Sequence, residues 1–241
     1  MNIGVIFAGG VGSRMHSKEK PKQFLEIYNK PIIVHTIEHF EKNELIDAVV
    51  VVCVENWIDY FNQLVYKYRL NKVKKVVPGG SSGQLSIYNG LCAAKDIAGS
   101  DSTIVLIHDG VRPLISPELL THNIEAVKKY GSSITSGIVK ETIVEIDDNG
   151  KIKIVPDRAH SRVAKAPQCF WLKDILGAHE KALSEGRTDF IDSCSMMNHY
   201  GFKLYMTDGP YENIKITTPD DFYTMRAILQ AKEDAQIYGL E

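Results

Sequence analysis

The 241-residue sequence contains no apolar segment long enough to cross a membrane. Its longest apolar run covers residues 48–54, whereas a membrane-spanning helix needs about 20 apolar residues. The amino-terminal residues also lack the long apolar core of a secretory signal peptide. We therefore expect a cytoplasmic protein with no membrane partner.

A strong excess of charge of either sign is absent as well. The chain has 28 Lys and Arg residues against 30 Asp and Glu residues, which gives a formal net charge of -2. Such a chain has no overall basic field that would attract nucleic acid or an anionic membrane surface. We expect no nucleic-acid partner, and any recognition of phosphate must depend on local basic groups.

Cysteines are few, and they form no motif. Cys53, Cys92, Cys169 and Cys194 lie far apart, and no C-x-x-C pair occurs. Most of them stand among apolar or small residues, a setting typical of buried free thiols. We interpret them as unpaired thiols of a protein in a reducing compartment, with a disulfide or a metal site as the alternative.

Repeats and low-complexity segments are also missing, and the chain instead alternates two patterns. Short runs rich in Val and Ile predict buried strands at residues 3–7, 48–54, 73–77, 103–108 and 133–139. Amphipathic stretches predict helices at residues 32–42, 57–68, 85–97 and 117–130. Strands that are apolar throughout and alternate with helices predict an α/β fold, with a mainly parallel sheet flanked by helices.

The pattern changes at "ETIVEIDDNGKIKIVPD", residues 141–157. Apolar residues alternate on both sides of Asp148-Asn149-Gly150, which predicts a β-hairpin arm at about residues 140–160. An isolated hairpin is marginally stable in water, so we expect the arm to pack on a second subunit. An ordinary surface hairpin of a monomer is the alternative. A strand near residues 164–170, a helix near 172–185, a strand near 202–206 and a helix from Pro219 follow the arm.

What the chain does have is a glycine-rich loop directly after its first apolar run. Gly9, Gly10 and Gly12 stand there, with Arg14 and Lys22 close behind. Glycine lets backbone N–H groups approach an anion, and the two cations neutralise phosphate charge. We interpret the segment as a phosphate-binding loop; a solvated basic loop with incidental glycines is the alternative.

This loop matches neither of two familiar phosphate-binding motifs. A Walker-type loop needs G-x-x-x-x-G-K-[ST], and no Lys-Ser or Lys-Thr pair follows these glycines. A dinucleotide-binding loop needs G-x-G-x-x-G, and Met15 occupies the position of its third glycine. The sequence therefore excludes Walker-type NTPases and NAD-dependent enzymes.

Several motifs together resemble the cytidylyltransferase family that includes methylerythritol-phosphate and ribitol-5-phosphate enzymes. They occur in the order of the family and span nearly the whole chain: "AGGVGSRM" followed by "PKQF", "PGGSSGQLSIYNGL", "HDGVRP", "DRAH" with "APQCF", "TDFIDSCSM" and "ENIKITTPDD". The resemblance implies one Rossmann-like nucleotidyltransferase domain over residues 1–241, with a β-arm that forms a homodimer. It implies attack by a polyol phosphate on the α-phosphorus of CTP, with release of pyrophosphate.

The resemblance also assigns roles to individual residues. The cations that stabilise the α-phosphate and the leaving pyrophosphate would be Arg14, Lys22 and Lys215. The nucleotide would also contact Ala8, Gly9, Gly10, Gly12, Gly79, Gly80, Ser86 and Asp109. The acceptor would contact Asp109, Arg112 and Asp189, while Thr142 and Arg158 would contact the polyol phosphate in the site of the neighbouring subunit. The implied cofactor is Mg²⁺, which takes oxygen ligands and would be held by Asp109.

Some of these residues have simpler alternative interpretations. Asp109 is also explained as a turn residue after a strand, and Arg112 as its ion-pair partner. Lys215 lies in a strand-like run, where a lysine usually faces solvent. Thr142 and Arg158 are also explained as ordinary residues of the arm.

Two departures from the family pattern bear on the substrates. Residues 81–84 read "SSGQ", where both branches usually carry an acidic residue and an arginine, so a charged contact near the nucleotide is missing. The middle of "SRVAKAPQ" also differs from both branches, and there Arg162 and Lys165 add positive charge.

The acceptor is indicated by the residues at the return of the arm. "RAH", residues 158–160, resembles the alditol-phosphate branch, whereas methylerythritol enzymes tend to have a Leu-Trp pair there. We therefore expect transfer of CMP from CTP to D-ribitol 5-phosphate, for cell-wall, teichoic-acid or capsule synthesis. The alternatives are a 2-C-methyl-D-erythritol 4-phosphate cytidylyltransferase of isoprenoid synthesis and a non-catalytic nucleotide-binding homologue.

Overall fold

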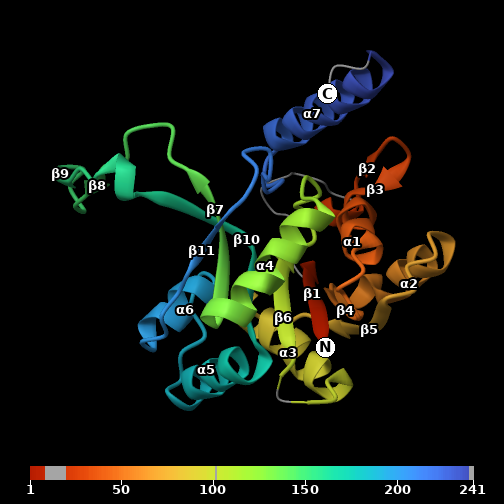
Figure 1. The fold of residues 1–241 in the computed structure, drawn as a ribbon, viewed down its shortest axis with the longest axis horizontal. Coiled ribbons are helices and arrows are strands. Elements are labelled where there is room, and N and C mark those ends of the chain that lie inside the picture. Colours follow the sequence, from red (N-terminus) through yellow and green to blue (C-terminus); the bar gives the residue numbers. More distant parts are fainter. Residues whose placement is uncertain (9–19, 101, 239–241) are drawn as a thin grey trace.

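A central β-sheet organises the protein. The structure is a computed structural model that describes residues 1–8, 20–100 and 102–238 (Figure 1). Within these residues, a seven-stranded sheet has the order β11-β7-β10-β6-β1-β4-β5. Its strands are β1 (Asn2–Ala8), β4 (Ala48–Cys53), β5 (Val73–Pro78), β6 (Ile104–Asp109), β7 (Ser132–Ile138), β10 (Arg162–Trp171) and β11 (Met206–Asp208).

Most neighbouring strands in this sheet are parallel. β1 pairs with β4 and β6, β4 pairs with β5, and β7 pairs with β11, all in parallel. β10 runs antiparallel to both of its neighbours, β6 and β7. The predicted α/β fold with a mainly parallel sheet is confirmed, and β10 is the antiparallel strand that interrupts it.

Helices cover both faces of the sheet. One face packs against α1 (Ile32–Lys42), α2 (Ile58–Lys67) and α4 (Pro117–Tyr130), and the other against α3 (Gly83–Ile97), α5 (Leu172–Ser184) and α6 (Ser193–His199). Alternate residues of β4 pack into the two helix layers. Val49 and Val51 pack on the side of α1, α2 and α4, and Val50 packs on the side of α3, α5 and α6. A strand covered on both faces needs apolar side chains at every position, which explains the continuous Val and Ile runs of the sequence.

The helix boundaries follow the sequence pattern closely. α1 and α4 begin and end at the predicted residues. α3 begins at Gly83 rather than at Leu85, because the Ser82 side chain caps it by accepting a hydrogen bond from the Leu85 N–H. α6 has no counterpart among the predicted elements, since its seven residues are too few to show a helical period.

A two-stranded ribbon protrudes from the sheet between β7 and β10 (Figure 1). It consists of β8 (Glu145–Ile146) and β9 (Ile152–Ile154), which pair antiparallel. The Asp147 side chain accepts hydrogen bonds from the N–H groups of Asn149 and Lys151, and Gly150 adopts a φ of 80° that favours glycine. The predicted hairpin is therefore confirmed.

The chain continues after β11 into the carboxy-terminal helix α7 (Pro219–Tyr238). Its first turn is capped reciprocally, because Asp221 accepts hydrogen bonds from the Thr218 N–H and hydroxyl, while Thr218 Oγ1 accepts from the Asp221 N–H. The remaining elements are short: the 3₁₀ helices η2 (Lys22–Phe24), η3 (Glu55–Trp57) and η4 (Arg158–His160), and the ribbon of β2 (Glu26–Ile27) and β3 (Lys30–Pro31).

The described residues bear on two predictions from the sequence, one about membrane-spanning helices and one about the cysteines. Among their helices, none combines the length and apolar character needed to cross a bilayer. The four cysteines carry free thiols, and burial raises the pKa of Cys53 to about 11. The interpretation as unpaired thiols is confirmed.

Candidate active site

The carboxyl ends of β1 and β6 lie side by side and form the centre of the candidate site. Phe7 of β1 is in register with Asp109, the last residue of β6. In open α/β sheets, ligands bind outside the carboxyl ends of the strands. Asp109 therefore occupies the position in this fold where a ligand-binding carboxylate is expected.

Two cations bind the Asp109 carboxylate from different segments. Lys215 Nζ, from the segment before α7, lies 2.5 Å from Oδ1, and Arg112 Nε lies 2.7 Å from Oδ2. Burial raises the pKa of Asp109, but Lys215 and Arg112 outweigh this effect and hold that pKa below its ordinary value. Asp109 is therefore an ionised carboxylate at neutral pH, and it fixes both cations in place.

Arg112 is held by more than this ion pair. Its Nη1 donates a hydrogen bond to the backbone oxygen of Asn213, 3.1 Å away, so it joins the end of β6 to the segment that carries Lys215. The ion pair with Asp109 that the sequence left as an alternative is therefore present. The same arginine also lines the cavity next to the carboxylate, and its contact with the acceptor stays a prediction.

A cavity of about 280 Å³ opens beside this cluster. Its walls come from β1, β6, β10, α3, α6 and the segment before α7. Charged groups around it are Asp109, Arg112, Lys165, Asp192 and Lys215, and apolar walls are supplied by residues such as Phe7. A small cavity with three cationic and two anionic side chains among apolar walls fits a phosphorylated ligand with several hydroxyl groups.

Lys22 lies next to this cluster although it follows β1. It is the first residue of η2, and its Nζ donates a hydrogen bond to the backbone oxygen of Ile216, 3.1 Å away. Gln23 is buried and donates to the backbone oxygen of Ala8 at the end of β1, 2.6 Å away. These contacts bring Lys22, Ala8 and the segment of Lys215 to one edge of the sheet, and their predicted contacts with the nucleotide stay predictions. Gly9, Gly10, Gly12 and Arg14 lie outside the described residues.

The second glycine loop follows β5 and is held by its own hydrogen bonds. The Gly79 N–H donates to the Cys53 oxygen at 2.9 Å, and the Gly80 N–H donates to Ser86 Oγ at 3.0 Å. A side chain at residue 80 would meet Leu85, because an added Cβ would lie 2.5 Å from the Leu85 Cβ. The loop therefore requires glycine there, and Ser86 fixes its shape.

The predicted acceptor residues on the arm lie apart from the cavity of their own chain. Thr142 is exposed, and Arg158 donates to the backbone oxygen of Lys140 at 3.4 Å. Asp189 is also set apart: its side chain is 75% exposed and pairs with Arg187 at 3.5 Å. The structure thus gathers Asp109, Arg112 and Lys215, but not these three.

The cavity also contains Asp192, which the sequence reasoning passed over, and Lys165, which it named only as an added positive charge. Asp192 lines it instead of Asp189, caps α6, and accepts a hydrogen bond from Gln168 at 2.9 Å. The signal for Asp192 was its position before a short polar helix, where Asp is a favoured cap. Lys165 lines the cavity as well, and its orientation depends on an irregularity of β10 that no sequence pattern shows.

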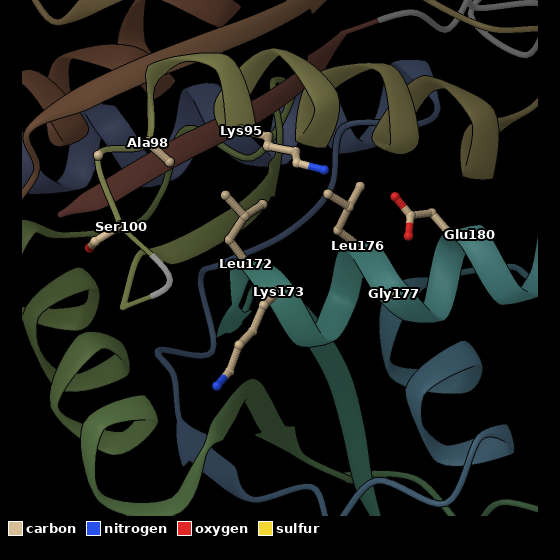
Figure 2. Close-up of a pocket in the computed structure, with 9 residues that line it drawn as sticks. Lys95, Ala98, Ser100, Leu172, Lys173, Leu176, Gly177 and Glu180 are labelled. Carbon is tan, nitrogen blue, oxygen red and sulfur yellow. The ribbon is translucent and has the colours of Figure 1, made fainter.

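A larger hollow lies elsewhere on the molecule. It has about 520 Å³ between the end of α3 and the start of α5 (Figure 2). Leu172 and Leu176 face α3 across it, whereas Lys173 extends in another direction. The Leu172 N–H bonds to the Thr103 oxygen just before β6, so this hollow lies at the end of β6 opposite Asp109. We therefore place the active site at the smaller cavity.

The fold and the cavity define a class: Rossmann-like α/β proteins that bind phosphorylated ligands at the carboxyl ends of a parallel sheet. Comparison with known proteins narrows this class. Residues 3–231 match the model of the IspD family, described as 2-C-methyl-D-erythritol 4-phosphate cytidylyltransferase. The chain belongs to this cytidylyltransferase family.

Relatives of two kinds are found within it. The chain is 58% identical to the ribitol-5-phosphate cytidylyltransferase of Streptococcus agalactiae serotype V, over 100% of both chains. It is 53% identical to the enzyme of the same name from Vibrio parahaemolyticus, over 99% of this chain and 100% of the relative. It is 40% identical to a 2-C-methyl-D-erythritol 4-phosphate cytidylyltransferase of Clostridium acetobutylicum, over 95% of this chain and 98% of the relative.

A solved structure supports the same assignment. The 4-diphosphocytidyl-2C-methyl-D-erythritol synthase of Anaerococcus prevotii superposes with a TM-score of 0.81 at 29% identity. The match covers 95% of this chain and 96% of that one. The resemblance seen in the sequence motifs is confirmed over nearly the whole fold.

Proposed function

We propose that this protein transfers a cytidylyl group from CTP to an alditol phosphate, D-ribitol 5-phosphate, and releases pyrophosphate and CDP-ribitol. The observation that carries the proposal is the cluster of Lys215, Asp109 and Arg112 on the cavity wall. Its support is the family membership, together with the higher identity to the ribitol-phosphate relatives than to the methylerythritol-phosphate relative named above. The finer roles below belong to the same proposal.

The chemistry requires positioning and charge more than a protein nucleophile. A phosphate oxygen of the acceptor attacks the α-phosphorus of CTP, a new P–O bond forms, and the bond to the pyrophosphate oxygen breaks with its electron pair. Negative charge builds up on the leaving group. Lys215, held by Asp109, and Lys22, held by the backbone oxygen of Ile216, stabilise this charge. Arg14 has the same role by its position in the glycine loop.

Asp109 acts first as a positioning residue for its two cations. Its carboxylate accepts one bond from Lys215 and one from Arg112, which uses about two of its four lone-pair positions. The remaining positions fit Mg²⁺, which is usually held by one or two carboxylates together with substrate phosphates. Mg²⁺ would neutralise charge on the phosphates of CTP.

The arm supports the proposal of a homodimer. Its apolar side chains are exposed in one chain, among them Ile146, Ile152, Ile154 and Val155. A two-stranded ribbon with such a surface is marginally stable alone and is stabilised when a second chain covers it. The arm would then carry Thr142 and Arg158 to the acceptor end of the partner's cavity.

The place of the reaction in the cell follows from its product. An activated alditol serves the assembly of polymers that contain alditol phosphate, so we place the enzyme in the cytoplasm, upstream of cell-wall or capsule synthesis.

A substrate panel tests the function. The purified protein is incubated with CTP, Mg²⁺ and, in turn, ribitol 5-phosphate, methylerythritol 4-phosphate and glycerol 3-phosphate, and pyrophosphate release is measured. We expect the highest kcat/KM with ribitol 5-phosphate, and little release when UTP, ATP or GTP replaces CTP. Turnover with methylerythritol 4-phosphate and none with ribitol 5-phosphate would overturn the proposed acceptor.

A further inference from the structure

Lys165 reaches the cavity because β10 is irregular at this point. The pairing with β7 shifts between Ala164 and Gln168, so β10 has extra residues opposite a short stretch of β7. Such a bulge changes the direction in which a side chain points. Lys165 lies within the bulge, and it lines the same cavity as Arg112 and Asp109.

The neighbouring strand leaves room for this lysine. An added Cβ on Gly137 of β7 would lie 2.9 Å from Lys165 Cε and 3.3 Å from its Nζ. The lysine stem therefore crosses directly over a glycine. Any larger residue at position 137 would displace the end of the Lys165 side chain, while the backbone around it could stay in place.

The ammonium group of Lys165 is held by backbone oxygens rather than by a carboxylate. Its Nζ donates to the oxygens of Tyr211 at 3.0 Å and Pro210 at 3.4 Å. In the part of the chain that the structure describes, no carboxylate lies within 4.0 Å of it. An ammonium has three N–H donors, so one remains for a ligand in the cavity.

The surroundings of Lys165 favour an oxygen-rich ligand. Burial and the nearby positive charges of Arg112 and Lys140 lower the pKa of Lys165, and together they outweigh Glu212, which raises it. A ligand oxygen that accepts a hydrogen bond from the ammonium would offset both effects. Lys140 and Lys165 both lie over the ring of Tyr211, 3.3 and 5.6 Å from its centroid, but Lys140 does not line the cavity.

The order of the cations along the sheet indicates which part of the acceptor reaches Lys165. Lys22 follows β1, Arg112 follows β6, and Lys165 stands on β10, which are neighbouring strands in this order. The reacting phosphate must lie near Lys22 and Lys215. The carbon chain of the acceptor then extends past Arg112 toward β10.

We propose that Lys165 is a specificity-determining residue that donates a hydrogen bond to a hydroxyl group at the far end of the alditol chain. This inference rests on the proposed function. It gives the enzyme a means to bind long alditol phosphates more tightly than short ones, independently of the nucleotide.

The test compares Lys165→Met with Lys140→Met in the full-length enzyme. Lys165→Met should raise the KM for ribitol 5-phosphate at least about tenfold, the usual effect of losing a hydrogen bond from a charged donor, and should change the KM for CTP less than about twofold. Lys140→Met should leave both KM values unchanged. Glycerol 3-phosphate, measured as a substrate or as a competitive inhibitor, is too short to reach Lys165 and should bind equally well to wild type and Lys165→Met.

A second variant tests the same contact without removing the lysine. Gly137→Ala should raise the KM for ribitol 5-phosphate in the same way, and the double variant with Lys165→Met should be no worse than Lys165→Met alone. The inference is overturned if Lys165→Met leaves the KM for ribitol 5-phosphate unchanged, or raises the KM for ribitol 5-phosphate and for CTP equally. It is also overturned if Lys165→Met weakens the binding of glycerol 3-phosphate as much as that of ribitol 5-phosphate, because Lys165 would then bind the phosphate. A wild-type enzyme that uses no alditol phosphate would instead contradict the proposed function itself.

Discussion

Lys215 Nζ and Asp109 Oδ1 lie 2.5 Å apart, and this ion pair joins the segment before α7 to the end of β6. The two residues are distant in the sequence, so the pair forms only when the whole sheet is assembled. It places an ammonium at the edge of the cavity, and Lys22 bonds the backbone of the next residue, Ile216. The site therefore depends on one buried carboxylate.

Asp109→Asn should lower kcat/KM by about 10- to 100-fold, because the amide keeps the shape of the side chain but loses the charge that holds Lys215 and Arg112. Steady-state kinetics with CTP and ribitol 5-phosphate measure the effect. Asp96→Asn is the matched control, since Asp96 pairs with Lys75 at 2.8 Å on the surface. Equal kinetics of the Asp109 and Asp96 variants would contradict the role of Asp109.

The same carboxylate predicts a pH dependence of stability. The folded pKa of Asp109 is below the ordinary 3.8, so its stabilising contribution is complete above that value and is lost as the pH falls through the lowered pKa. The difference in unfolding free energy between wild type and Asp109→Asn should therefore be large at about pH 7 and smaller at about pH 3. Urea unfolding at both pH values measures it, and a difference that does not change with pH would contradict the ion-pair interpretation.

Lys22→Ala should lower kcat by about 100-fold while the Kd for CTP changes only about threefold, because the lysine stabilises charge that develops in the transition state. Arg14→Ala should behave in the same way. Single-turnover kinetics and equilibrium binding of CTP separate the two quantities. Lys20→Ala serves as the control, since Lys20 pairs with Glu26 at 3.2 Å. A near-normal kcat in Lys22→Ala would rule out the catalytic role.

The double variant Ile146→Glu, Ile154→Glu of the arm should convert the proposed dimer into monomers. Each substitution places a charge on the apolar surface that a second chain is proposed to cover. Light scattering coupled to size-exclusion chromatography measures the mass. Ile237→Glu, on an exposed position of α7, is the control and should stay dimeric. A monomeric wild-type protein would contradict the proposed assembly.

An active site shared between two subunits can be detected by mixing two inactive variants and measuring the activity that returns. When inactive Arg158→Ala and Lys22→Ala proteins exchange subunits, each mixed dimer regains one site with both residues intact. Activity should return to about a quarter of the wild-type level if exchange is random. Mixing two batches of Lys22→Ala is the control, and an inactive mixture after demonstrated exchange would mean that Arg158 does not act across the interface.

Gly80→Ala should destabilise the protein by about 1–3 kcal/mol and raise the KM for CTP, because the new methyl group meets Leu85 in the loop after β5. Thermal unfolding and steady-state kinetics measure the two effects. Gly177→Ala in α5 meets nothing within 4 Å and should instead be neutral or stabilising by up to about 1 kcal/mol. A Gly80→Ala protein as stable as wild type would contradict the tight packing of this loop.

The sequence predicted the parts of the fold that depend on local pattern. Continuous Val and Ile runs identified the buried strands, and the Asn-Gly pair identified the hairpin. The motif resemblance identified Asp109, and the structure places it at the carboxyl end of a buried strand, where ligands bind in such sheets. The motif resemblance supplied the residues of the glycine loop, and their roles stay predictions.

The parts that were missed depend on contacts between distant segments. Asp189 and Asp192 lie in one motif, and only the start of α6 decides that Asp192 faces the cavity while Asp189 faces solvent. Lys165 required knowledge of the bulge in β10 and of Gly137 on the next strand. Neither is a local property of the residues involved.

The position of β6 in the sheet has a consequence for how such enzymes diversify. β1, β4 and β5 lie on one side of this strand, and β10, which contacts α6, lies on the other. Asp109 stands at the border between them. If the β1 side binds the nucleotide as proposed, substitutions in β10 and α6 can change the accepted alditol while the proposed nucleotide half stays intact, so new acceptors can evolve on an unchanged transferase.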